Sequence, residues 1–213
     1  MSTSTRLDAF TDAAFAFAVT LMVVGAGGAP VDPDAMRALV AAVPSFAIGF
    51  AIIAMFWFAH VQWRRHRGEG DWRSVLLSVA LIFVVLLYVT PLRAMATSFA
   101  AYMLGRPDAF GGDLKSLFTL YGVGFVTMAA LTAALFDDAR RNAASPEQRH
   151  ELAGLTGIWL IQLATGALST LIAQLPGGGG IAPWLYATLP ATVPTFSVLW
   201  SRRRQPQPST TEN

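Results

Sequence analysis

The sequence contains no cysteine, and charged residues occupy only 13% of its 213 positions. The absence of cysteine excludes a disulfide framework and any thiolate metal site, and three histidines offer no metal-ligand spacing. A soluble domain carries about 25% charged residues, whereas this chain is 54% hydrophobic and has a mean hydropathy of +0.49. The composition therefore predicts an integral membrane protein.

Long apolar runs recur along the whole chain, separated by short polar or glycine-rich connectors. A helix of about 20 residues crosses a hydrocarbon core of roughly 30 Å, and lipid admits only helices or closed barrels. The alternation typical of barrel strands is absent. We therefore predict an all-α fold with one six-helix transmembrane domain over residues 1–204 and a disordered polar tail over 205–213. Its six transmembrane helices are placed at about 7–25, 35–62, 73–97, 113–137, 152–175 and 181–201.

Arginine and lysine are distributed unevenly between alternate connectors. With the N-terminus in the cytoplasm, eleven of these residues fall on the cytoplasmic side and four on the outside, namely Arg37, Arg93, Arg106 and Lys115. Cytoplasmic loops carry an excess of such residues, so both termini are predicted to be cytoplasmic. The basic clusters mark topology in a multi-pass protein of the plasma membrane, with lipid as its surroundings and no nucleic acid as a partner.

Residues 1–29 have an alternative interpretation as a cleavable signal peptide that ends in small residues. Asp8 and Asp12 make a poor flank for such a segment, and cleavage would leave an odd number of spans. We therefore expect the first helix to be retained.

The first apolar segment, RLDAFTDAAFAFAVTLMVV, begins with ionisable residues. An ionisable side chain inside a span costs roughly 2.5 to 3.5 kcal/mol on insertion scales and is usually paired and functional. Arg6 lies about 9 Å before Asp12 along a helix, and His60 reaches the same membrane face if the second helix is antiparallel. A cluster of Arg6, Asp12 and His60 would satisfy all three. The alternative is that Asp12 caps its helix and His60 is an interfacial residue.

One face of the first helix combines apolar side chains with a single hydroxyl. Its positions follow helical spacing and are Phe10, Ala13, Phe17, Thr20 and Val24. Contributed by several copies, such a face would line a narrow path with bulky apolar constrictions. The alternative is that Phe17 and Val24 face lipid or a neighbouring helix while Thr20 bonds to its own helix.

Two motifs resemble those of the TMEM175 family of potassium channels. The first segment resembles the family's RxxxFSD signature, and FWFAHVQW resembles its second-helix motif of an aromatic residue followed by Trp-x-x-His. The matching positions are Arg6, Phe10, Thr11, Asp12, Trp57 and His60. Threonine replaces the usual serine, and Val61 stands where a second histidine is common.

The resemblance implies a homotetrameric potassium-selective channel, with K⁺ as the permeant ion, no cofactor and no enzymatic activity. It implies that the first helix of each subunit lines the pore and that the motif arginine, aspartate and histidine form an interhelical network. The apolar constriction would comprise Phe17, Leu21 and Val24, and Thr20 would supply the hydroxyl that favours potassium. Phe17 departs from the isoleucine or leucine that is common at the constriction.

A proton-coupled secondary transporter that titrates Asp12 and His60 is the main alternative, and a noncatalytic membrane scaffold is another. Carriers tend to show internal repeats and broken helices, and the second half of this chain repeats neither motif. The absence of a repeat favours the channel. It also requires oligomerisation, because one chain with one pore-type helix cannot enclose an axis.

Features elsewhere in the chain are predicted to be structural. Gly122 and Gly124, within TLYGVGF, are expected to allow close helix packing. Asp137 and Asp138 at a cytoplasmic helix end are expected to be solvated. Four prolines lie inside the spans and can kink them without carrying chemistry, namely Pro44, Pro91, Pro190 and Pro194.

Overall fold

The computed structural model describes residues 3–24, 32–68, 70–105 and 114–202, and within these ranges it contains helices and no strand. The predicted tail at 205–213 lies outside the described residues. The longer helices are α1 (Thr3–Val24), α3 (Val43–Arg67), α4 (Trp72–Met103), α5 (Leu114–Arg141) and α6 (Pro146–Ile172). The shorter ones are α2 (Pro33–Ala41), the 3₁₀ turn η1 (Gly178–Gly180), α7 (Ala182–Tyr186) and α8 (Leu189–Arg202).

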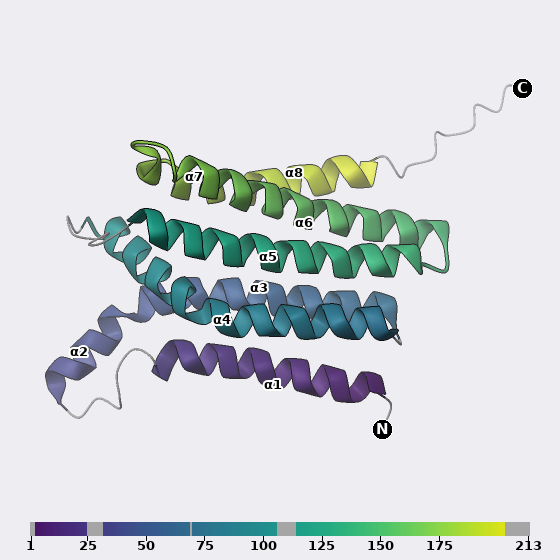
Figure 1. Ribbon diagram of the computed structural model, residues 1–213, viewed down its shortest axis with the longest axis horizontal. Coiled ribbons are helices and arrows are strands. Elements are labelled where there is room, and N and C mark those ends of the chain that lie inside the picture. Colours follow the sequence, from purple (N-terminus) through teal and green to yellow (C-terminus); the bar gives the residue numbers. More distant parts are fainter. Residues whose placement is uncertain (1–2, 25–31, 69, 106–113, 203–213) are drawn as a thin grey trace, which may run out of the picture.

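The long helices lie side by side in a bundle (Figure 1). Helix α1 forms one edge and packs on α3 and α4, whereas α8 lies at the opposite edge against α6. Among the described residues, α3, α4, α5 and α6 are long and apolar enough to cross a membrane by length and composition. The all-helical membrane class is thus confirmed. Helix α1, which carries the first motif, forms one edge of the bundle.

The core is an aromatic and aliphatic cluster to which α1, α3, α4, α5 and α6 all contribute. Phe56 is fully buried in it, with ring centroids 5.8 Å from Phe125 and 5.1 Å from Trp159. Helix α5 approaches its neighbours closely because a Cβ atom at Gly122 would collide with Thr170, and one at Gly124 would collide with the ring of Tyr88. The helix-packing role predicted for these two glycines is confirmed.

The segment predicted as one span over 35–62 forms two helices, with a break at Ala42. Pro44 lies in the first turn of α3, where its missing N–H is tolerated, but it cannot continue a helix from α2 because its ring clashes with the carbonyl four residues earlier. The backbone N–H of Ala35 donates to Asp32 Oδ1 at 2.7 Å and caps α2. Helix α3 continues past residue 62 and ends at Arg67, with Gly68 as its C-cap, where a φ of 64° favours glycine.

The segment predicted as one span over 181–201 is also divided, into α7 and α8. The division falls just before Pro190, which lies in the first turn of α8, and Pro194 lies inside that helix. At 1.5 Å per residue the 14 residues of α8 span about 21 Å, less than a hydrocarbon core of roughly 30 Å. Pro91, by contrast, lies within an unbroken α4.

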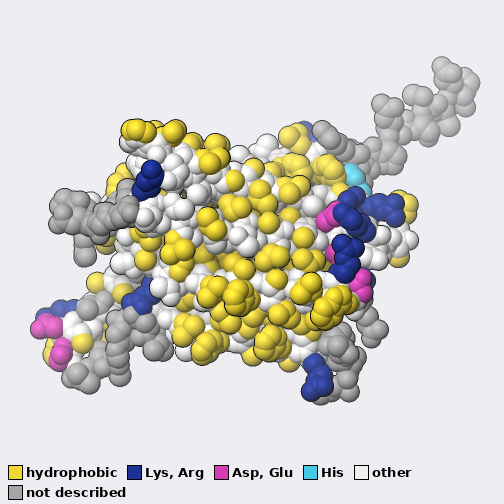
Figure 2. Space-filling model, in the orientation of Figure 1, with side chains coloured by type: hydrophobic (Ala, Val, Ile, Leu, Met, Phe, Trp, Pro, Cys, Tyr) yellow, Lys and Arg dark blue, Asp and Glu magenta, His cyan; other side chains and the backbone are white. Residues whose placement is uncertain are grey.

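Arginine, aspartate and histidine side chains gather at one end of the bundle (Figure 2). Helix α1 begins at this end and α8 ends there (Figure 1). Helix α4 begins there with Asp71 as its N-cap, and α6 begins with Ser145, whose side chain accepts from the backbone N–H of Gln148 at 3.1 Å. This arginine-rich end is where the ionisable residues of the first motif lie.

Candidate pore helix and its anchors

Helix α1 has a buried face and an exposed face. The buried face packs on α3 and α4, follows helical spacing, and comprises Thr11, Phe15, Ala18 and Met22. The Thr11 hydroxyl donates to the Leu7 carbonyl at 2.8 Å, so this motif position is satisfied within the helix and faces the protein interior. The bundle therefore fixes which side of α1 points away from the other helices.

The exposed face carries the positions implied as constriction and selectivity residues. Phe10 and Phe17 are each 56% exposed, and Leu21 is 36% exposed. Thr20 is also exposed, and its hydroxyl donates to the Ala16 carbonyl at 2.9 Å. Because the hydroxyl proton is used within the helix, the oxygen lone pairs remain free to accept or to coordinate a cation. Helix α1 ends at Val24, whose side chain lies outside the described residues.

Asp12 contacts α3 through a tryptophan. Its Oδ1 atom accepts a hydrogen bond from Trp57 Nε1 at 2.8 Å. Two motif residues 45 positions apart in the sequence are thereby joined, so the two motifs meet in space. The cap function considered for Asp12 does not occur, because α1 begins at Thr3, well before this position.

His60 is buried and faces α4. Its Nε2 atom lies 3.0 Å from Ser78 Oγ, and its ring lies 5.1 Å from that of Trp63. Ser78 is fully buried, and sequence reasoning did not identify it as a partner. The contact joins α3 to α4 at the point where the second motif ends.

Asp12 and His60 lie on the wall of one cavity of about 510 Å³, and no hydrogen bond joins them to each other. Both residues line it, together with Asp8, Val61, Arg64, Arg65 and Gly68. Arg6 is exposed on the helix surface and is not among the residues that line this cavity. In the described part of the chain, the Asp12 and His60 side chains thus bond to Trp57 and Ser78, and Arg6 bridges neither of them.

The ion pair that joins α1 to α3 is formed by Asp8 and Arg64. Arg64 Nε lies 2.6 Å from Asp8 Oδ1, and Arg64 Nη2 lies 3.2 Å from Asp8 Oδ2. This two-point geometry is the strong form of an arginine–carboxylate contact. Sequence reasoning missed this pair. The available signal was spacing, because Asp8 lies one turn before Asp12 and Arg64 lies one turn after His60.

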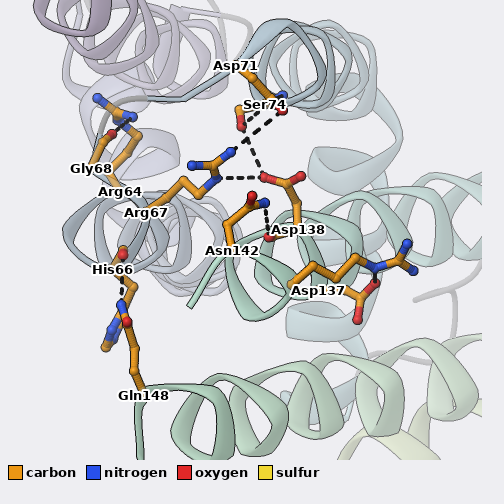
Figure 3. Close-up of polar contacts among 11 residues, drawn as sticks. Arg64, His66, Arg67, Gly68, Asp71, Ser74, Asp137, Asp138, Asn142 and Gln148 are labelled. Carbon is orange, nitrogen blue, oxygen red and sulfur yellow. Dashed lines mark hydrogen bonds and ion pairs between the residues drawn. The ribbon is translucent and has the colours of Figure 1, made fainter. Parts of the chain in front are cut away.

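A second polar network joins α3, α4 and α5 at the same end (Figure 3). Arg67 Nε donates to Asp138 Oδ2 at 2.9 Å, and the Ser74 hydroxyl donates to the same oxygen at 3.1 Å. The expectation that Asp138 is solvated is therefore wrong, because its side chain is only 10% exposed. The backbone N–H of Ser74 donates to Asp71 and, with the Ser74 hydroxyl and the Arg67 charge, lowers the pKa of Asp71.

Residues 6–89, which contain both motifs, most of α1, all of α2 and α3 and the first part of α4, match the family described as "Endosomal/lysosomal potassium channel TMEM175". The predicted TMEM175 resemblance is confirmed. A relative from Marivirga tractuosa described as "Potassium channel" is 36% identical over 92 residues. That match covers 43% of this chain and 37% of the relative.

Two solved TMEM175 structures share the fold. The potassium channel MtTMEM175, crystallised as a variant with a nanobody–MBP fusion protein, superposes with a TM-score of 0.79 at 23% identity, covering 95% of this chain and 94% of that one. The lysosomal potassium-selective channel TMEM175 homologue from Chamaesiphon minutus gives 0.62 at 18% identity, covering 94% and 99%. The family and both structures are channels by these descriptions, and none is an enzyme.

Proposed function

We propose that the chain is one subunit of a potassium channel whose ion path is lined by the exposed face of α1. The observation that carries this proposal is the orientation of α1. Its Thr11 and Phe15 face is buried against the bundle, and its Phe17 and Thr20 face is left open. The match of residues 6–89 to a potassium channel family supports the same assignment.

The subunit has six membrane crossings with both termini in the cytoplasm, in the plasma membrane. In addition to α3 to α6, α1 and the α7–α8 segment complete the six. The arginine-rich end is the cytoplasmic end, because cytoplasmic loops carry the excess of basic residues. The start of α1 and the end of α8 at that same end support this topology (Figure 1).

Four copies surround the pore, since one α1 cannot enclose an axis. Two features of the exposed face suit it to this role. Ala13 and Ala16 are exposed there, and small residues allow helices to approach closely in lipid. Thr20 places a hydroxyl where a helix that merely faces lipid would carry apolar side chains. A closed cyclic assembly buries this face in every subunit.

Phe17 forms the narrowest apolar ring, with Leu21 and Val24 beyond it, and gates by excluding water. The Thr20 hydroxyl lies one turn further along and presents oxygen lone pairs to a dehydrated K⁺ ion. Asp12, Trp57 and His60 hold the helix in position and do not contact the ion. The potassium channel descriptions of the relatives favour this mechanism over a proton-coupled transporter that titrates Asp12 and His60.

The test is potassium flux into liposomes that contain the purified protein. Phe17→Ala opens the constriction and is expected to raise the flux, whereas Thr20→Ala is expected to reduce the preference for K⁺ over Na⁺ about fivefold, the equivalent of one hydrogen bond. Phe83→Ala on α4 is the matched control, because Phe83 is 62% exposed and lies on another helix. It is expected to leave flux unchanged.

Absence of flux in all variants, or flux that neither the Phe17 nor the Thr20 substitution alters, would contradict the pore assignment. The assembly is tested separately by the molecular mass in detergent. A mass well below four chains of 22.8 kDa would contradict the tetramer.

A further inference from the structure

A large apolar cavity lies between α3 and α4 on one side and α5, α6 and α7 on the other. Its volume is about 470 Å³, within the roughly 300–1,000 Å³ typical of small-molecule sites. Most of its walls are hydrocarbon and aromatic, including Ile52, Met95, Phe99 and Phe125. The cavity is separate from α1 and from the arginine-rich end, so the ion path does not use it.

One wall of the cavity carries a buried polar atom that lacks a hydrogen-bond partner. Gln162 is only 5% exposed, and its Oε1 atom accepts no hydrogen bond from the described residues. It lies inside α6, far from either end of that helix. An unsatisfied acceptor in such surroundings costs free energy, so this oxygen requires a donor that the described part of the chain does not supply.

A second polar atom, the Tyr186 hydroxyl, is buried and lines the same cavity. Ser169 interacts with this hydroxyl, but no hydrogen bond of ordinary length and angle joins it to the described residues. Its ring is held edge-on by Phe125, with centroids 5.3 Å apart, and by Tyr121 at 5.8 Å. Phe125 and Tyr121 stack on each other. The Tyr186 ring is therefore fixed by its neighbours before any ligand arrives, which reduces the entropy cost of binding.

We propose that this cavity binds a membrane-soluble alcohol with a long apolar body. The alcohol hydroxyl donates its proton to Gln162 Oε1, and its oxygen accepts from the Tyr186 hydroxyl. The apolar body lies along the hydrocarbon wall. A hydroxyl suits the site because it is donor and acceptor at once, which is what these two atoms require together.

Other occupants fit the cavity less well. A pure hydrocarbon, such as a lipid acyl chain, leaves the Gln162 oxygen without a donor. A carboxylate brings negative oxygens towards the Gln162 carbonyl and loses its hydration in apolar surroundings. Water alone leaves the apolar walls wet. The mouth carries Met103, 62% exposed, and Trp184, 54% exposed, so the ligand enters from the lipid.

The test uses bromine, which quenches tryptophan fluorescence at short range. The full-length protein is reconstituted in phosphatidylcholine liposomes and titrated with ω-bromoundecanol, with bromoundecane as the probe that lacks the hydroxyl. Trp184 lines the mouth, so the alcohol is expected to give a saturable quenching component that Trp184→Phe removes. Bromoundecane is expected to give only the linear quenching caused by partition into lipid.

Substitutions then test the two polar contacts. Gln162→Leu and Tyr186→Phe each remove one hydrogen bond and are expected to weaken the saturable binding about fivefold. Gln174→Leu is the matched control, because Gln174 is a glutamine that follows α6 and donates to Thr119 outside the cavity. It is expected to bind the alcohol as the wild type does.

Linear quenching by both probes would overturn the proposal. Equal saturable binding of bromoundecane, or saturable binding of the alcohol that neither Gln162→Leu nor Tyr186→Phe weakens, would overturn it as well. The assay does not use ion flux, so its outcome is independent of the proposed channel function.

Discussion

The ion pair between Asp8 and Arg64 yields a quantitative prediction about how α1 is held. The Arg64 side chain is 12% exposed and the Asp8 side chain 42%. Removing one partner of a fully buried pair costs about 3–5 kcal/mol, whereas a fully exposed pair contributes about 0–1 kcal/mol. Arg64 also donates to the Gly68 carbonyl at 2.6 Å, so its guanidinium keeps one partner. Asp8→Asn is therefore expected to lower the free energy of unfolding by about 2 kcal/mol.

A double-mutant cycle separates the pair from other effects of each substitution. Its members are Asp8→Asn, Arg64→Gln and the double variant, with the free energy of unfolding measured by denaturant in detergent micelles. Because the two side chains are in direct contact, we expect a coupling energy of about 1–2 kcal/mol. The control cycle is Asp34→Asn with Arg37→Gln. Those side chains are 89% and 78% exposed, so their coupling is expected to stay below about 0.5 kcal/mol.

The outcome that would refute this reasoning is a coupling energy no larger than that of the exposed control pair. It would mean that burial of the Arg64 guanidinium does not strengthen the contact, and that α1 is held at this end by its apolar face alone. Raising the salt concentration gives an independent check. Exposed charges are screened more than buried ones, so the control cycle should lose its coupling first.

Two further substitutions, each paired with a control, test contacts among the helices other than α1. Asp138→Asn removes the closer of the two carboxylates that face Arg67, which is only 12% exposed and keeps Asp71 at 3.6 Å, and thermal unfolding should report a loss of about 2 kcal/mol. The same change at Asp137, whose partners lie on its own helix, should cost under about 1 kcal/mol. Gly122→Ala places a Cβ where α5 meets α6 and should destabilise by about 1–3 kcal/mol. Gly180→Ala meets nothing within 4 Å and should be neutral; equal losses at the two glycines would contradict the packing argument.

The orientation of α1 could be anticipated because it follows from local spacing. Phe10, Phe17 and Thr20 share a face by helical periodicity alone, and that face is exposed in the structure. The membrane class followed equally directly, from composition and from the length of the apolar runs. Both properties depend on residues close together in the sequence.

The polar partners could not be anticipated, because they depend on how helices rotate against one another. Asp12 bonds to Trp57 rather than to the nearer Arg6, since α1 presents its aspartates to α3 and leaves Arg6 on the surface. Asp138 accepts a hydrogen bond from Arg67, which lies 71 positions earlier in the sequence and on another helix. Pro44 signalled the break at Ala42, but a proline does not always end a helix. Pro91 lies inside α4 without interrupting it, so the sequence alone could not tell the two cases apart.

In the described part of the chain, the polar contacts of α1 with other helices lie in its first half, so this helix can tilt about its attachment at the arginine-rich end. Asp8 and Asp12 bond to α3, whereas beyond them the described residues that hold α1 to the bundle, such as Phe15 and Met22, are apolar. At 1.5 Å per residue the end of α1 at Val24 lies about 18 Å from Asp12, so a tilt of about 10° moves that end by about 3 Å and Phe17 by about 1 Å. A small rotation about a fixed base is thus amplified towards the opposite membrane face.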